Sequence, residues 1–377
     1  MDIKPFSDYD LLPIYVRVAD DLRAKLGSPP FQYGALLPSE LELSKAYNLS
    51  RGTIRKALDI LANENRISRQ PGRGTIILPP DVENGIRHRI AVVWSIIRAV
   101  SSEMFAGLER QIAGAKCDLL FSSSEHEPDK EAQILQRLIN SDIDGVVLYG
   151  TGDKNNYGLL KALVDKGTPL VLLDRFMPEL RDQVSWVTSA NEQGAYEITR
   201  HLIGLGHRRI AYVVWTPDHE DISTLIERRA GYLQALAEAD LDPDHAPILS
   251  MCGSQWLQPD FAERLWALLD ENQPTALFFH SDACAFRASL LMEQHGIHIP
   301  KDISVAGFDG LRLPFDFSPL NLTTAVQDFD RLGEEAGRAV VEMVRHPKRE
   351  PLHIRVPVTL HVGETTIPIG ERQHERR

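Results

Sequence analysis

The first 80 residues alternate apolar and polar positions with the period of short amphipathic helices. Apolar side chains recur every four residues from Ile14 to Leu26, which predicts a helix over residues 13–26. The run Ser39-Glu40-Leu41-Glu42 has the form of a capping box and predicts the start of a second, short helix. A third helix is predicted from a cap at Ser50 to about residue 63, because apolar residues return at helical spacing in this stretch.

Two short apolar segments follow the third helix. They cover residues 67–69 and 75–78 and flank Gln70-Pro71-Gly72-Arg73-Gly74, a pattern that predicts two strands joined by a basic wing. Residues 79–88 are polar and Pro-rich, as is typical of a linker. We therefore predict a first domain over residues 1–78, a larger domain over residues 89–370 and a disordered tail at 371–377.

From residue 89 onward, strand-length apolar runs alternate with helical stretches of ten or more residues. Runs that are apolar throughout indicate parallel strands that are covered on both faces by helices. The length of this part favours two lobes, each with a doubly wound parallel sheet, and hinges between them near residues 189 and 322. The runs are Ile90–Trp94, Cys117–Phe121, Asp144–Tyr149, Leu170–Leu173, Ile210–Val214, Ala276–Phe279 and Ile303–Ala306.

The distribution of charge separates the two parts. The whole chain has a net charge of −12, yet residues 1–80 carry 11 basic and 9 acidic side chains. Residues 51–75 hold six of the basic side chains against two acidic ones. A local basic excess on an acidic protein marks the place where a polyanion would bind.

Several classes of protein are disfavoured. No apolar run is long enough for a transmembrane helix, and the N-terminus lacks the pattern of a secretory signal, so we expect a cytoplasmic protein without membrane contact. Cys117, Cys252 and Cys284 are widely spaced and fit neither a disulfide framework nor a zinc site. No nucleotide-binding loop or nucleophile elbow is present, so we expect no enzyme activity, no cofactor and no metal.

The N-terminal part resembles the GntR family of winged-helix regulators. The resemblance rests on Pro13-Ile14-Tyr15, Leu37-Pro38-Ser39-Glu40, the run from Ser50 to Leu58, and Gly72-Arg73-Gly74-Thr75. It implies double-stranded operator DNA as the partner, with an arginine able to donate two hydrogen bonds to a guanine edge. Leu41 stands where the family usually has arginine. The candidate DNA-binding residues are Ser39, Glu40, Ser50, Arg51, Gly52, Thr53, Arg55, Lys56, Arg69, Gly72, Arg73 and Gly74.

Residues 89–367 resemble the sensor domain of the LacI family, which is similar to periplasmic sugar-binding proteins. The matching runs include Gly204-Leu205-Gly206-His207, Glu227-Arg228-Arg229-Ala230-Gly231-Tyr232 and the stretch from Ile299 to Asp309. A GntR-type head on a LacI-type body is similar to the arabinose-repressor subgroup. This resemblance implies a homodimeric regulator, by family habit a repressor, whose effector is a sugar or sugar derivative.

Ligands of such a body are expected between the lobes, beyond the carboxyl ends of the parallel strands. Arg228 and Asp309 resemble effector contacts of the family. Asp282 could instead cap its helix, and Trp256 could be a core residue. The candidate effector-binding residues are Ser101, Ser102, Ser123, Arg175, Thr224, Arg228, Trp256, Asp282, Asp309 and Gln327.

Three alternatives stay open at the level of sequence. The body could dimerise or bind a protein without taking any small-molecule effector, and this is the strongest alternative. The chain could also be a solute-binding protein, although the head and the absent signal argue against transport. An enzyme fused to a DNA-binding head would need a catalytic constellation in the cleft, and none is visible.

Overall fold

The computed structural model describes residues 13–373, except 64–65, 71–73, 79–87, 96–98, 217–221, 243–246, 253–259, 312–319 and 348. Contacts divide the chain into two compact units, one ending at Arg87 and the other beginning at His88. Most of the predicted linker, the wing tip with Gly72 and Arg73, Trp256 and the last four residues of the predicted tail lie outside the described residues.

The first unit is a winged helix-turn-helix, as the sequence predicted. Its three helices pack around a core that includes Val18, Leu22 and Ile54, and its sheet has the order β1-β3-β2 with antiparallel pairing. The elements are α1 (Ile14–Lys25), β1 (Leu36–Leu37), α2 (Glu40–Tyr47), α3 (Arg51–Asn63), β2 (Ile67–Gln70) and β3 (Gly74–Ile77).

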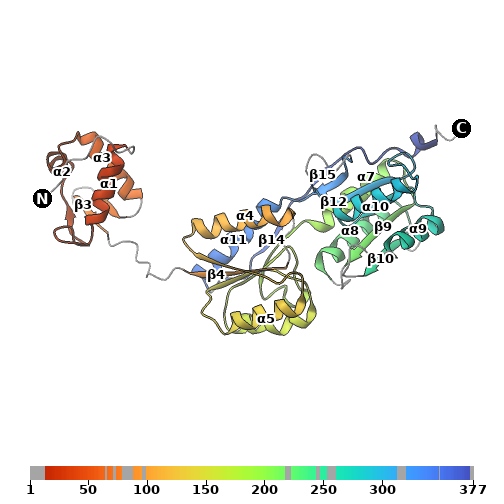
Figure 1. Cartoon of the computed structure of the whole chain (residues 1–377), viewed down its shortest axis with the longest axis horizontal. Helices are drawn as coiled ribbons and strands as arrows, with labels where there is room; N and C mark the ends of the chain where they lie inside the picture. The colour runs from red at the N-terminus through yellow and green to blue at the C-terminus, as the bar shows by residue number, and fades with distance from the viewer. Residues whose placement is uncertain are drawn as a thin grey trace. The chain divides into compact units, whose positions relative to one another are not determined.

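The second unit begins with a lobe built on a six-stranded parallel sheet. Helices α4 and α11 cover one face of this sheet and α5 and α6 cover the other (Figure 1). The strands, in sheet order, are β14 (His353–Val356), β8 (Ser185–Ser189), β7 (Leu170–Leu173), β6 (Gly145–Tyr149), β4 (Arg89–Trp94) and β5 (Asp118–Ser123). The helices are α4 (Ala99–Gly114), α5 (Pro128–Ile139), α6 (Tyr157–Asp165) and α11 (Phe329–Arg345).

The second lobe repeats this architecture with one departure. Helices α7 and α8 pack on one face of its sheet, and α9 and α10 pack on the other. The strands, in sheet order, are β10 (Ile248–Cys252), β9 (Ile210–Thr216), β11 (Ala276–Phe279), β12 (Ser304–Asp309), β13 (Thr323–Val326) and β15 (Thr359–His361). The helices are α7 (Asn191–Gly204), α8 (Ser223–Glu238), α9 (Asp260–Asn272) and α10 (Asp282–Gln294).

The predicted α/β fold with two doubly wound sheets is confirmed, and two details are corrected. Strand β15 runs antiparallel to β13, so the second sheet is not wholly parallel. The crossover predicted near residue 322 lies further along the chain, because β13 pairs with β12 and belongs to the second lobe. The chain crosses after β8, again between β13 and α11, and a third time between β14 and β15.

Candidate functional site

The helix-turn-helix of the head is fixed by two side-chain caps. Ser39 and Glu42 form the predicted capping box at the start of α2. At the start of α3, the Oγ of Ser50 accepts a hydrogen bond from the backbone N–H of Thr53 at 3.2 Å. Both caps satisfy N–H groups that a helix terminus leaves unpaired, so they fix where each helix begins.

The first turns of α3 present a basic face to solvent. Arg51, Gly52, Arg55 and Lys56 are exposed, whereas Thr53 is half-buried. The ammonium of Lys56 lies 5.7 Å from the ring centroid of Tyr15, a cation–π contact that links α3 to α1.

Two of the basic side chains are paired within the head. Arg55 donates from Nε and Nη2 to the two carboxylate oxygens of Glu40, at 3.0 and 2.8 Å. Nη1 of Arg69 lies 2.7 Å from a carboxylate oxygen of Asp59. The hydrogen bond from Arg55 is the main cause that lowers the pKa of Glu40, and the charges of Arg69 and Arg51 add to it. The guanidinium of Arg55 is thus held in a fixed orientation while it remains exposed.

In the second unit, polar side chains from both lobes converge where parallel strands end. Arg228 of α8 lies at the centre of this group and is almost fully buried. Its Nε donates to Oδ1 of Asn191 at 2.9 Å, and its Nη1 donates to the carbonyl of His280 and lies 3.3 Å from Oδ1 of Asp309. The guanidinium also lies 3.7 Å from the ring centroid of Phe308. One arginine therefore links the ends of β11 and β12 to the first crossover.

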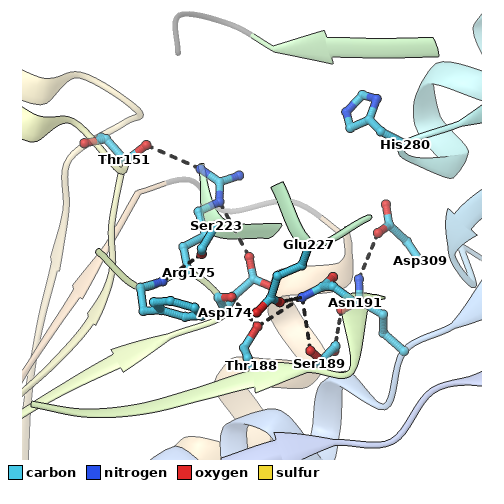
Figure 2. A network of polar contacts seen from close by, with 12 residues as sticks. Thr151, Asp174, Arg175, Thr188, Ser189, Asn191, Ser223, Glu227, His280 and Asp309 are labelled. Atoms are coloured by element: carbon cyan, nitrogen blue, oxygen red, sulfur yellow. Dashed lines mark hydrogen bonds and ion pairs between the residues drawn. The ribbon is translucent and has the colours of Figure 1, made fainter. Parts of the chain in front are cut away.

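Asp309 ends β12 with its carboxylate toward the space between the lobes (Figure 2). Its Oδ1 accepts a hydrogen bond from Nε2 of Gln327 at 2.8 Å. Burial raises the pKa of Asp309 to about 7, although the positive charge of Arg228 opposes this rise. His280 faces the same space, and burial lowers the pKa of its ring to about 3, so the ring is neutral at neutral pH.

The first lobe contributes Asp174 and Arg175, which follow β7. Burial raises the pKa of Asp174, and its φ of 68° lies in the left-handed region, which few residues other than glycine adopt. Arg175 donates to the carbonyl of Thr151 at 3.4 Å, and its Nε lies 3.6 Å from a carboxylate oxygen of Asp174 (Figure 2). These long contacts leave much of the donor capacity of the guanidinium open to a ligand.

A small pocket adjoins Arg175. Its lining comes from both lobes and includes Glu131, Gly150, Arg175, Phe176, Ile222 and Ser223. Glu131 is buried and accepts hydrogen bonds from the backbone and hydroxyl of Thr151 and from Asn156, so its carboxylate shapes the loop after β6.

The other candidate effector residues differ in burial. Ser101 and Ser102 lie near the start of α4, the first buried and the second exposed. Ser123 ends β5, and Thr224 is buried near the start of α8.

Asp282 is hydrogen-bonded within the second lobe. Its carboxylate is fully buried and accepts hydrogen bonds from the N–H groups of Gly310 and Leu311 and the hydroxyl of Thr324, each at 2.7 Å. The alternative that Asp282 caps its helix is wrong, because the cap of α10 is Ser281. Asp282 instead anchors the loop that follows Asp309.

Sequence reasoning missed Asn191, Glu227 and His280. His280 directly follows β11, a predicted strand, so the same positional rule could have found it. Asn191 opens α7 just after β8, a strand that the sequence did not predict, so the rule could not have found it. Glu227 immediately precedes Arg228 on a helix, and no sequence signal indicates that its partner is Arg355, 128 residues further along the chain. Among the described residues, no cluster of His, Cys, Asp and Glu is arranged to hold a metal ion, and no helix is long and apolar enough to cross a membrane.

Comparisons with known proteins agree with both units. Residues 14–77 match the model of the gntR family of bacterial regulatory proteins, and residues 199–366 match the periplasmic binding protein-like domain. The chain is 25% identical to an arabinose metabolism transcriptional repressor from Geobacillus stearothermophilus, over 88% of this chain and 92% of that one. It is 30% identical to the HTH-type transcriptional repressor PurR of Aliivibrio salmonicida, over 66% of this chain and 72% of that one.

A solved structure shares the fold of the second unit. It is a LacI family transcriptional regulator from Enterococcus faecium with bound ribose, which superposes with a TM-score of 0.61 at 22% identity. The match covers 74% of this chain and 99% of that one.

Proposed function

We propose that this chain, which belongs to the DNA-binding transcription regulators that join a GntR-type head to a LacI-type body, is a repressor controlled by a small polar effector between its lobes. The effector class that we propose is a sugar or sugar derivative. The observation that carries the proposal is the convergence of Arg228, Asp309 and Gln327 with Asp174 and Arg175 of the facing lobe.

The chemistry of the cleft favours vicinal hydroxyls. Carboxylates accept hydrogen bonds from hydroxyls and guanidinium groups donate to them, so a sugar hydroxyl can satisfy both at once. Two relatives support this class, because one is named for arabinose metabolism and another was solved with ribose. The proposal gives the cleft a binding role and no catalytic one.

The head supports operator binding. Arg51 and Arg55 lie on the exposed start of α3, a position from which arginine can enter a major groove. We propose further that two copies bind a pseudo-palindromic operator as a homodimer in the cytoplasm, since symmetric proteins bind symmetric sites. Effector and operator then influence each other through the relative position of the lobes.

The test is a thermal-shift screen of the full chain against pentoses, hexoses, their phosphates and nucleosides. We expect at least one stabilising compound, and we expect Asp309→Asn to raise its dissociation constant at least about tenfold, as the loss of a charge-assisted hydrogen bond predicts. Asn tolerates the left-handed backbone of position 309, where φ is 131°, better than Ala does. Asp270→Asn, an exposed change on α9, serves as the matched control.

A screen without any stabilising compound would contradict the effector assignment and favour a body that only dimerises or binds a protein. Operator binding is tested separately by gel shift with Arg51→Ala and Arg55→Ala. Unchanged specific binding by both variants would contradict the assignment of α3 as the recognition helix.

A further inference from the structure

An ion pair joins the two lobes beside the effector arginine. Glu227 lies on α8 of the second lobe, directly before Arg228, and Arg355 lies on β14, the edge strand of the first lobe's sheet. Nη2 of Arg355 donates to Oε1 of Glu227 at 2.7 Å. The side chain of Glu227 is 11% exposed and that of Arg355 is 37% exposed. The pair therefore depends on the relative position of the lobes.

Glu227 is connected to Arg228 through Asn191. The Nδ2 of Asn191 donates to Oε2 of Glu227 at 3.3 Å and to the carbonyl of Ser189 at 3.1 Å, while its Oδ1 accepts from Nε of Arg228. Figure 2 shows Glu227 beside Asn191 and Ser189 at the crossover that follows β8. Arg355, Glu227, Asn191 and Arg228 thus form one continuous polar chain from the edge of the first lobe to the cleft.

A second contact holds the same face of α8 to the first lobe. Ser223 lies four residues before Glu227 on this helix, and its Oγ accepts a hydrogen bond from the N–H of Phe176 at 3.0 Å. The ring of Phe176 stacks on Trp186 with centroids 5.0 Å apart, and Arg355 lies 5.4 Å from the centroid of Trp186. Both contacts of α8 with the first lobe therefore involve residues at or next to the stacked rings of Phe176 and Trp186.

We propose that Glu227 and Arg355 form an interlobe latch that stabilises the closed arrangement of the lobes and so holds Arg228 in position for the effector. Separation of the lobes would leave the largely buried Glu227 without its cation, which is unfavourable. The consequence for effector binding rests on the proposed function, but the latch itself does not. In this role Glu227 and Arg355 are positioning residues and need not touch the effector.

The test measures the distance between lobes in the effector-free, full-length protein by double electron–electron resonance. Spin labels are attached to Arg137→Cys on α5 and Glu271→Cys on α9, at two exposed positions. The chain without these two changes is treated with the same label, to show how far the native cysteines react. Arg355→Met removes the charge but keeps an apolar stem over Trp186. We expect it to raise the ratio of open to closed molecules roughly tenfold, a modest effect because Arg355 is partly exposed.

Three further variants separate a latch from a general loss of packing. Arg355→Lys keeps the positive charge and is expected to stay close to the original distribution. Arg349→Met is the matched control, because Arg349 pairs with Glu342 within the first lobe, and it should change nothing. Glu227→Gln should open the lobes as Arg355→Met does, and the double variant should open them no further than either single change, because both remove one interaction.

An unchanged distance distribution in Arg355→Met and Glu227→Gln would overturn the latch. Opening in Arg355→Lys as large as in Arg355→Met would also overturn it, since charge would then not be what holds the lobes. Neither result depends on the identity of an effector. The latch can therefore fail while the sugar screen succeeds, and the screen can fail while the latch holds.

Discussion

Single candidate binding residues in both units are held by polar and charged neighbours. Glu40 fixes the guanidinium of Arg55 with two parallel hydrogen bonds, and Arg228 and Gln327 both donate to Asp309. An exposed ion pair contributes little to stability, so under the proposed function DNA would replace Glu40 as the partner of Arg55 at a small cost in free energy. The buried pair in the cleft is different, because an unpaired charge there is strongly unfavourable.

The titration of Asp309 gives a prediction at this scale. Its pKa is about 7 in the folded protein and 3.8 in the unfolded reference, so the folded state holds a proton that the unfolded state releases. The resulting stability is fully present below about pH 4 and is lost as the pH rises through about 7. Asp309→Asn cannot ionise, so we expect its Tm, relative to that of the unmodified protein, to increase from pH 5 to pH 8.

Calorimetry of both proteins across this range checks the prediction. Asp282 and Asp174 also titrate with raised pKa values near Asp309, so only the difference between variant and parent is informative. Asp270→Asn should give a difference that does not vary with pH. A constant difference for Asp309→Asn as well would show that burial does not raise the pKa of this carboxyl.

At the scale of elements, α4 and α11 pack closely because glycines line their contact. A Cβ at Gly333 would lie within 3 Å of the backbone of Met104 and Leu108, and one at Gly107 would meet the backbone of Asp330. Glycine lowers the intrinsic helix propensity of both segments. The tertiary contact explains why these glycines are compatible with stable helices.

We therefore expect Gly333→Ala to destabilise the first lobe by about 1–3 kcal/mol, because the facing backbone cannot move aside as a flexible side chain could. Gly114→Ala, at the end of α4, meets no atom within 4 Å and is the matched control. Its expected effect is between none and a slight stabilisation. Thermal unfolding of the full chain compares the two, and equal Tm values would contradict the close packing of α4 and α11.

At the scale of the whole molecule, charge is divided between the units. The head carries a small basic excess, whereas the rest of the chain accounts for more than the entire net charge of −12. DNA is therefore attracted to the head and repelled by the body. Under the proposed function, this division would make phosphate contacts of the head the main source of salt dependence in DNA binding.

Arg51→Ala tests this division. If Arg51 neutralises one phosphate, the slope of log affinity against log salt for a non-specific duplex should become shallower by about 0.9. Arg208→Ala, an exposed change in the second lobe, should leave the slope as it was. Fluorescence anisotropy at several salt concentrations gives both slopes, and an equal change in the two variants would count against the head as the DNA-binding unit.

The sequence alone determined the elements whose signals are local. Caps at Ser39 and Ser50, helical periodicity in α1 and α3, and the continuous apolar runs of β4, β7 and β11 predicted where these elements lie. Strands β8 and β13 escaped prediction because Ser and Thr interrupt their apolar pattern, although both are buried in the sheet. Helix α11 was also missed, although its apolar residues recur at helical spacing.

Only the tertiary structure decided which side chains meet. Asp282 and Asp309 both lie near strand ends. The carboxylate of Asp282 accepts hydrogen bonds from backbone N–H groups, whereas that of Asp309 faces the cleft. The pairing of Glu227 with Arg355 joins segments that are 128 residues apart. Local patterns reflect the geometry of a single helix or strand. Contacts such as this one arise because the chain crosses three times between the lobes. The spacing of residues in the sequence does not indicate these crossings.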